Sequence, residues 1–267
     1  MSAAPLELKS LTRMFGGLRA VGDLSFRAEA GQLMGLIGPN GAGKTTVFNL
    51  ITGVYQPTEG TITLGEETIA EGGKGRRLRP SVIAAAGIAR TFQTSRLFGG
   101  LTVLDNMRLG FHLRAKASWL DATLHLPRHR RDEAAITERA LELLDRFDLL
   151  EYTDELANAL PYGQQRRLEI ARALAGAPRV LLLDEPAAGM NPQETADLSQ
   201  LIRWVREHFD LTVLLIEHDM RLVMEICERI VVVDHGVKIA EGTPHEIRSN
   251  PKVIEAYLGE EVPAGVH

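Results

Sequence analysis

The segment that most constrains the fold of this chain is a glycine-rich loop, GPNGAGKTT, at residues 38–46. It follows the apolar run Leu33–Ile37 and precedes a segment that places four apolar residues on one helical face: Val47, Leu50, Ile51 and Val54. The sequence therefore predicts a strand, a loop and a helix in direct succession. Glycines allow backbone N–H groups to converge on phosphate oxygens, and the N-terminus of the helix attracts the same anion.

The loop matches the pattern G-x-x-x-x-G-K-[ST], which is typical of nucleotide phosphate sites. Lys44 can reach the β- and γ-phosphates, and the hydroxyl of Thr45 can ligate Mg²⁺. An ordinary glycine-rich turn would give no reason for the Lys-Thr pair. We expect the whole loop to bind the nucleotide, through Gly38, Pro39, Asn40, Gly41, Ala42, Gly43, Lys44, Thr45 and Thr46.

Two acidic residues, Asp184 and Glu185, follow the apolar run Val180–Leu183. A buried strand would deliver both carboxylates to the sheet edge that presents the phosphate loop. Asp184 suits Mg²⁺, which prefers few protein ligands and keeps several waters. Glu185 can then orient or deprotonate the attacking water. The alternative, a strand that ends in two solvated acids, becomes weak once a phosphate loop stands upstream.

The composition is that of a globular protein, with 45% hydrophobic and 24% charged residues among 267. The net charge of −5 offers no basic field, so we expect no nucleic-acid partner. The single cysteine, Cys227, excludes an internal disulfide and is expected in the core. No secretory signal or membrane-spanning apolar run is evident, so any membrane role should come through a partner.

The distribution of apolar residues predicts an α/β fold with a mainly parallel sheet, an antiparallel β subdomain and an inserted helical subdomain. Short buried strands are expected at 180–183, 212–216 and 229–233, and a helical stripe runs from Ile136 to Phe147. All of 1–267 is expected to form one domain. Its predicted parts are the antiparallel layer at 5–32 and 60–70, the nucleotide-binding core at 33–59 and 177–250, the helical subdomain at 95–175 and a C-terminal helix at 251–262.

The segment Leu160–Leu174, LPYGQQRRLEIARAL, resembles the signature of ABC-type ATPases, whose usual core is Leu-Ser-Gly-Gly-Gln. Its matches are Leu160, Gly163 and Gln164, and a helix is expected from Gln164 onward. Three further residues resemble family motifs in family order: Phe15 as the adenine-stacking aromatic, Gln93 as the Q-loop glutamine and His218 as the switch histidine. The resemblance covers nearly the whole chain, so a P-loop NTPase core of the ABC ATPase type is expected.

The resemblance implies a head-to-tail dimer, in which Gly163 and Gln164 of one subunit close over ATP held by the other. It also implies that Glu185, His218 and Gln93 are catalytic, and that Thr45, Gln93 and Asp184 serve Mg²⁺. The sequence departs from the family pattern at Pro161 (usually serine), Tyr162 (usually glycine) and Asn191 (often aspartate). These departures count against full activity at both sites of a homodimer, and a heterodimer with a more regular partner subunit would accommodate them. The second ATPase subunit is therefore expected to be either another copy of this chain or a related chain.

A finer resemblance is to the ATP-binding subunits of branched-chain amino-acid importers. It rests on the stretches at residues 13–18, 162–167, 185–192, 216–220 and 256–260. It implies two integral-membrane permease subunits, a second ATPase subunit, an external solute-binding protein and a peripheral position on the cytoplasmic face of the inner membrane. Leu97, Phe98 and Leu101 would either receive a permease helix or pack within the helical block.

Other functions of the same family compete with amino-acid import. One is an export ATPase of the lipopolysaccharide-extracting type, which has a similar C-terminal tail. Another is a soluble ABC ATPase of translation or repair, but such relatives usually carry two ATPase halves or a long coiled coil. A P-loop switch that does not hydrolyse ATP is disfavoured by the set of Asp184, Glu185 and His218.

Overall fold

The computed structural model describes residues 2–73, 75, 79–92, 96–112 and 127–258. The chain divides into two compact units. The first unit comprises Met1–Arg90 and Arg179–His267, and the second comprises Thr91–Pro178. The second unit is thus an insertion between two parts of the first.

A six-stranded sheet forms the centre of the first unit, in the order β10-β9-β3-β8-β7-β6. Neighbouring strands are parallel, except that β10 returns antiparallel to β9. Every residue of β3, β7 and β8 is buried, which is typical of a parallel sheet covered on both faces. The strands are β3 (Leu33–Ile37), β6 (Ile88–Arg90), β7 (Val180–Asp184), β8 (Thr212–Ile216), β9 (Arg229–Asp234) and β10 (Val237–Gly242).

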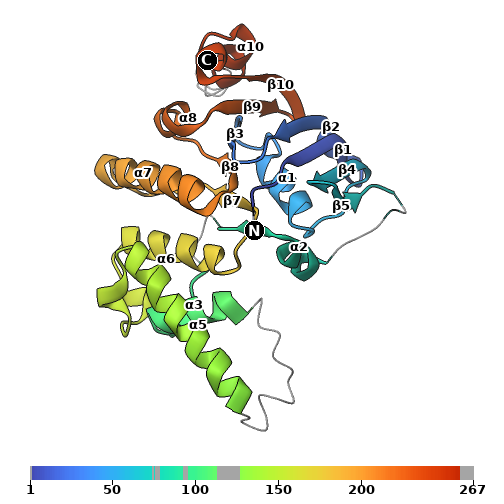
Figure 1. The fold of residues 1–267 in the computed structure, drawn as a ribbon. Helices are drawn as coiled ribbons and strands as arrows, with labels where there is room; N and C mark the ends of the chain where they lie inside the picture. Colours follow the sequence, from blue (N-terminus) through green and yellow to red (C-terminus); the bar gives the residue numbers. More distant parts are fainter. Residues whose placement is uncertain (1, 74, 76–78, 93–95, 113–126, 259–267) are drawn as a thin grey trace. The chain divides into compact units, whose positions relative to one another are not determined.

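Helices flank this sheet, with α1 on one side and α7 and α8 on the other (Figure 1). Two helices begin with a complete capping box, α7 after Asn191 and α9 after Thr243. The helices of the first unit are α1 (Lys44–Ile51), α2 (Pro80–Ala86), α7 (Pro192–Phe209), α8 (Met220–Ile226), α9 (Pro244–Arg248) and α10 (Pro251–Leu258).

A separate four-stranded antiparallel sheet, in the order β2-β1-β4-β5, packs over α1. Leu6, Leu8 and Ile62 of this sheet share one hydrophobic cluster with Phe48 and Leu50 of α1. The helix that follows the phosphate loop is therefore held from both sides by apolar contacts. The strands are β1 (Leu6–Phe15), β2 (Leu18–Ala28), β4 (Glu59–Leu64) and β5 (Glu67–Glu71).

The second unit is helical, with α3 (Val103–His112), α5 (Pro127–Arg146) and α6 (Tyr162–Ala175), and short 3₁₀ turns at Leu150–Tyr152 and Ala157–Ala159. The predicted stripe on α5 buries Ala140, Leu143 and Leu144, and Phe147 is buried just after the helix end. The predicted α/β class, with a mainly parallel sheet, an antiparallel sheet and a helical insertion, is confirmed. No helix among the described residues is long and apolar enough to span a bilayer.

The sequence analysis missed β6, β10 and α2, and it misplaced Val54. β6 has only three residues and so shows no readable alternation, and β10 mixes apolar with charged residues. α2 has seven residues with only Ile83 buried, so it shows no apolar stripe at helical spacing. Val54, which is expected on the apolar face of α1, is exposed because that helix ends at Ile51. Cys227 is buried, as predicted.

Candidate nucleotide site

The phosphate loop connects β3 to α1 and is held close to neighbouring backbone. Gly38 has φ +153°, and a Cβ there would lie 1.9 Å from the carbonyl oxygen of Val233. Gly43 has φ +95°, and a Cβ there would lie 2.5 Å from the carbonyl oxygen of Ala20. Both positions therefore need glycine for space as well as for backbone conformation.

Lys44 is buried, and its side chain lies within the loop. Nζ donates hydrogen bonds to the carbonyl oxygens of Gly38, at 2.5 Å, and Pro39, at 2.7 Å. Gly43 caps α1 without a side-chain hydrogen bond, so the N–H groups of the first helical turn face no capping side chain. The loop thus combines a fixed ammonium group with a helix N-terminus, and both attract phosphate.

Asp184 and Glu185 stand at the same sheet edge as the loop. β8 is paired in parallel with both β3 and β7, so the carboxyl ends of β3 and β7 point the same way. Asp184 is 4% exposed and its Oδ2 lies 2.6 Å from Nη2 of Arg90. No sequence motif marks Arg90, because the ion pair joins residues that are 94 positions apart in the chain.

Glu185 and His218 are in direct contact. Oε1 of Glu185 lies 2.9 Å from Nε2 of His218, which follows β8. The backbone of Glu185 has φ +47°, a left-handed conformation that is rare outside glycine and clusters at functional sites. The structure therefore brings together two residues that the sequence analysis selected separately.

Glu217 is a buried acid that the sequence analysis did not select. Its carboxylate accepts hydrogen bonds from the backbone N–H of Ala187, at 2.7 Å, and of His218, at 3.0 Å. It thereby joins the turn after Glu185 to the segment that carries His218. Burial raises the pKa of Glu217 above its ordinary value, and the backbone hydrogen bonds oppose that rise.

Phe15 ends β1 beside the turn at residues 16–17 and is 37% exposed. Its ring packs edge-on against Tyr55 with centroids 5.1 Å apart, and the guanidinium of Arg13 lies 4.4 Å from its centroid. Arg13 also donates to the carbonyl oxygen of Gln56 at 2.8 Å. An exposed aromatic ring held in this way can stack on a base, and Arg13 and Tyr55 are its unpredicted supports.

The signature segment lies in the second unit, and its helix begins earlier than expected. α6 starts at Tyr162, with Pro161 as N-cap, so Gly163 and Gln164 lie in its first turn. The expected start at Gln164 was wrong because proline can precede the first turn without any side-chain cap. The phenol oxygen of Tyr162 accepts a hydrogen bond from Nη2 of Arg166 at 2.9 Å.

A buried ion pair anchors α6 to the chain on either side of residues 93–95. Nη1 of Arg166 lies 2.7 Å from Oε2 of Glu169, and each side chain is only 3% exposed. Arg166 donates to the carbonyl oxygen of Phe92 at 3.0 Å, and Glu169 accepts from the backbone N–H of Arg96 at 2.8 Å. Gln93 itself lies outside the described residues. Of the predicted groove residues in this region, Phe98 is 54% and Leu101 is 37% exposed.

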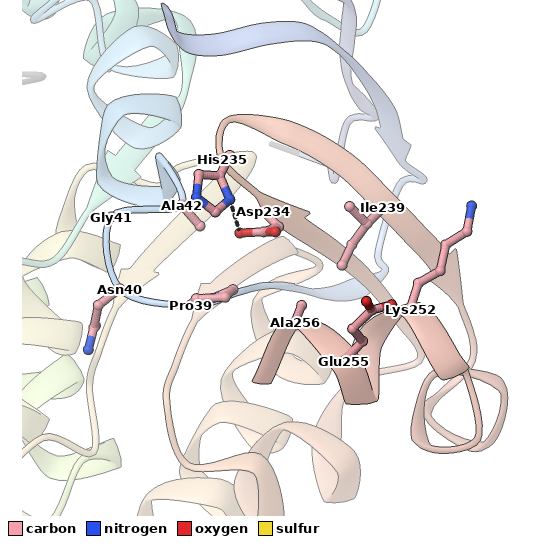
Figure 2. Close-up of a pocket in the computed structure, with 10 residues that line it drawn as sticks. All are labelled: Pro39, Asn40, Gly41, Ala42, Asp234, His235, Ile239, Lys252, Glu255 and Ala256. Atoms are coloured by element: carbon pink, nitrogen blue, oxygen red, sulfur yellow. Dashed lines mark ion pairs between the residues drawn. The ribbon is translucent and has the colours of Figure 1, made fainter. Parts of the chain in front are cut away.

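A cavity of about 750 Å³ adjoins the phosphate loop in the first unit. Pro39 and Asn40 lie on its loop side, while Glu255 and Ala256 of α10 form the opposite wall (Figure 2). Nδ1 of His235 lies 2.7 Å from Oδ1 of Asp234 at its rim. The cavity makes the loop accessible from the side of the C-terminal helix. It is also lined by Gly41, Ala42, Ile239 and Lys252.

The oxygen donors at this edge fit a magnesium ion that is bound together with phosphates. Mg²⁺ takes one or two carboxylates, waters and phosphate oxygens rather than an all-protein cage. The Asp184 carboxylate and the Thr45 hydroxyl are oxygen donors of the kind that could hold such an ion. Among the described residues there is no group of three or more acidic, histidine or cysteine side chains that could hold a metal alone.

Two family models and several curated proteins are similar to this chain. Residues 21–188 match the family model for ABC transporters, and residues 237–263 match the model described as branched-chain amino acid ATP-binding cassette transporter. The chain is 49% identical over 97% of its length to the whole of the high-affinity branched-chain amino acid transport ATP-binding proteins LivG of Salmonella typhimurium and BraF of Pseudomonas aeruginosa.

A third curated relative and a solved structure are more distant. The lipopolysaccharide export system ATP-binding protein LptB of Escherichia coli is 35% identical over 97% of this chain and 98% of its own length. The ADP conformation of an ATP-binding cassette from an ABC transporter superposes with a TM-score of 0.81 at 29% identity. That match covers 97% of this chain and the whole of the other.

Proposed function

This chain belongs to the ABC transporter family, and from that premise we propose that it binds and hydrolyses ATP to energise the import of branched-chain amino acids. The observation that carries the proposal is the convergence at one sheet edge of the Lys44 loop, Asp184 and the Glu185–His218 pair. Nucleotide binding follows from the family, and the residue roles below are our proposals.

The phosphate loop holds the phosphate groups of ATP. Its backbone N–H groups and the N-terminus of α1 bind the oxygens, and the ammonium of Lys44 moves its hydrogen bonds from the loop carbonyls to the β- and γ-phosphates. Thr45, Asp184 and Gln93 would hold Mg²⁺, which when bound neutralises phosphate charge during transfer. Phe15 stacks on the adenine.

Glu185 is the base that orients and deprotonates the attacking water. Its Oε1 lies 2.9 Å from Nε2 of His218, and this contact orients the carboxylate at the sheet edge. His218 would contact the γ-phosphate, and its contact with Glu185 would couple release of that phosphate to the position of the base. Glu217 supports both residues by holding the backbone N–H groups of Ala187 and His218.

A second ATPase subunit completes the site. Gly163 and Gln164, in the first turn of α6, would contact ATP held by the other subunit, as the family resemblance implies. Because two subunits share each ATP, turnover per protomer should fall when the protein is diluted.

The chain is a transporter subunit and therefore acts at a membrane with permease partners. We propose that two permease subunits, a second ATPase subunit and an external solute-binding protein form the complete importer. The ATPase would lie on the cytoplasmic face of the inner membrane, with the exposed Phe98 and Leu101 against a permease. The net charge of −5 supports the expectation that nucleic acid is not a partner.

Purification of the tagged chain from its native membranes tests this assignment. We expect two polytopic permeases and a second ATPase subunit to co-purify, together with Mg²⁺-dependent ATP hydrolysis. Co-purification of lipopolysaccharide-transport components would instead support the export alternative, which the lower identity to LptB disfavours. Recovery of the chain without any membrane protein would contradict both transport functions.

A further inference from the structure

One buried arginine connects the phosphate-loop helix to the acidic strand end. Arg90 is the last residue of β6, in register with Leu182 of β7. Its Nη2 donates to Oδ2 of Asp184 at 2.6 Å, and its Nη1 donates to Oδ1 of Asn49 at 2.7 Å. Asn49 lies on α1, five residues after Lys44. One guanidinium therefore bonds to side chains of two elements that both reach the nucleotide site.

Burial strengthens the electrostatic attraction between Arg90 and Asp184. The side chains of Arg90 and Asp184 are each 6% exposed, so water competes little for either charge. The guanidinium is planar and presents its donors in a rigid fork, and it lies 5.4 Å from the ring centroid of Phe48. With Oδ2 of Asp184 held by Arg90, the direction of Oδ1 is fixed as well.

We propose that Arg90 is a positioning residue for the magnesium–nucleotide site. It aims Oδ1 of Asp184 at the metal and ties Asp184 to the phosphate-loop helix through Asn49. This inference rests on the proposed function. Partners that orient a metal-binding side chain typically matter by 10- to 100-fold in metal affinity. Lysine at this position would keep the charge but could not reach both Asp184 and Asn49.

The test compares Arg90→Lys with the wild-type chain in two binding measurements. The first is the affinity for ADP by calorimetry, with Mg²⁺ and with EDTA. The second is the affinity for Mn²⁺ by electron paramagnetic resonance in the presence of ADP. We expect ADP binding in EDTA to change by less than about twofold, and Mn²⁺ binding to weaken by roughly tenfold. A purely structural role would lower thermal stability without changing Mn²⁺ affinity selectively.

Arg203→Lys is the matched control. Arg203 also bridges two elements of the first unit, because it donates from α7 to the backbone and side chain of Glu225 on α8. It should leave both affinities unchanged. If Arg90→Lys does not fold, Asn49→Ala replaces it, since it cuts the tie to α1 but leaves the buried ion pair intact. That variant should weaken Mn²⁺ binding in the same direction.

The outcomes separate this inference from the proposed function. Wild-type protein that binds ADP and Mn²⁺, with unchanged Mn²⁺ affinity in the folded variant, would overturn the role of Arg90 alone. Wild-type protein that binds no ADP under either condition would overturn the proposed function as well.

Discussion

Replacement of Glu185 by glutamine should separate ATP binding from ATP hydrolysis. Glutamine has nearly the same shape as glutamate and can keep the 2.9 Å contact with His218. The turn is held independently of the carboxylate, because the backbone N–H of Glu185 donates to the carbonyl oxygen of Ile216 at 2.9 Å. The variant should therefore fold normally and lack only the proton acceptor.

The expected loss of turnover follows from the scale of a general base. Such a group contributes roughly 10²- to 10⁴-fold, which corresponds to about 3–5 kcal/mol of transition-state stabilisation. Phosphate release at saturating ATP measures the turnover, and calorimetry measures the affinity for ATP. We expect turnover to fall by that factor, while the dissociation constant for ATP changes by less than about threefold, well below the 1.4 kcal/mol that a tenfold change represents.

The matched control is Glu207→Gln on the solvent side of α7, where the carboxylate is 61% exposed and lies 3.6 Å from Arg206. It removes the same charge and should leave turnover unchanged. Turnover of Glu185→Gln at a rate close to that of the wild type would refute the role of Glu185 as the base. Loss of ATP binding in that variant would show instead that the carboxylate is needed to build the site.

Three further changes test other parts of the site. Lys44→Ala removes the charged donor in the loop and should weaken ADP binding by roughly 10- to 100-fold in calorimetry, whereas equal affinity would exclude a phosphate contact. Gly38→Ala forces a Cβ to within 1.9 Å of the Val233 carbonyl oxygen and should lower the free energy of unfolding by roughly 3 kcal/mol in urea titration; an unchanged midpoint would contradict the close approach. Burial raises the pKa of Glu217 in the folded state, so wild-type stability should fall as the pH rises from 4.5 through the raised pKa. Glu217→Gln should flatten that decline in urea midpoints measured from pH 4 to pH 8, and an identical decline in both proteins would show that another group causes it.

Local patterns made much of the fold predictable. The phosphate loop, the buried strands β3, β7, β8 and β9, and the capped starts of α7 and α9 are each specified by neighbouring residues. β6 was missed because three residues carry no periodicity, although it joins the central sheet beside β7. Its place depends on a pairing that is distant in sequence.

Residues of the candidate site could be predicted from the sequence only where they belong to a recognisable motif. The loop, Asp184, Glu185 and His218 follow from motifs, and the structure adds that Glu185 and His218 touch. Arg90 and Glu217 have no such signal, because their partners are brought to them by the sheet. The roles of Gly163 and Gln164 depend on a second subunit, so neither the sequence nor one chain can fix them.

The most direct test of the account is ATP hydrolysis by the complete transporter in proteoliposomes, measured with and without leucine and the solute-binding protein. The account predicts that leucine raises the hydrolysis rate and that Glu185→Gln in this subunit abolishes most of the increase. An identical rate with and without leucine, isoleucine or valine would contradict the proposed coupling of this ATPase to the import of branched-chain amino acids.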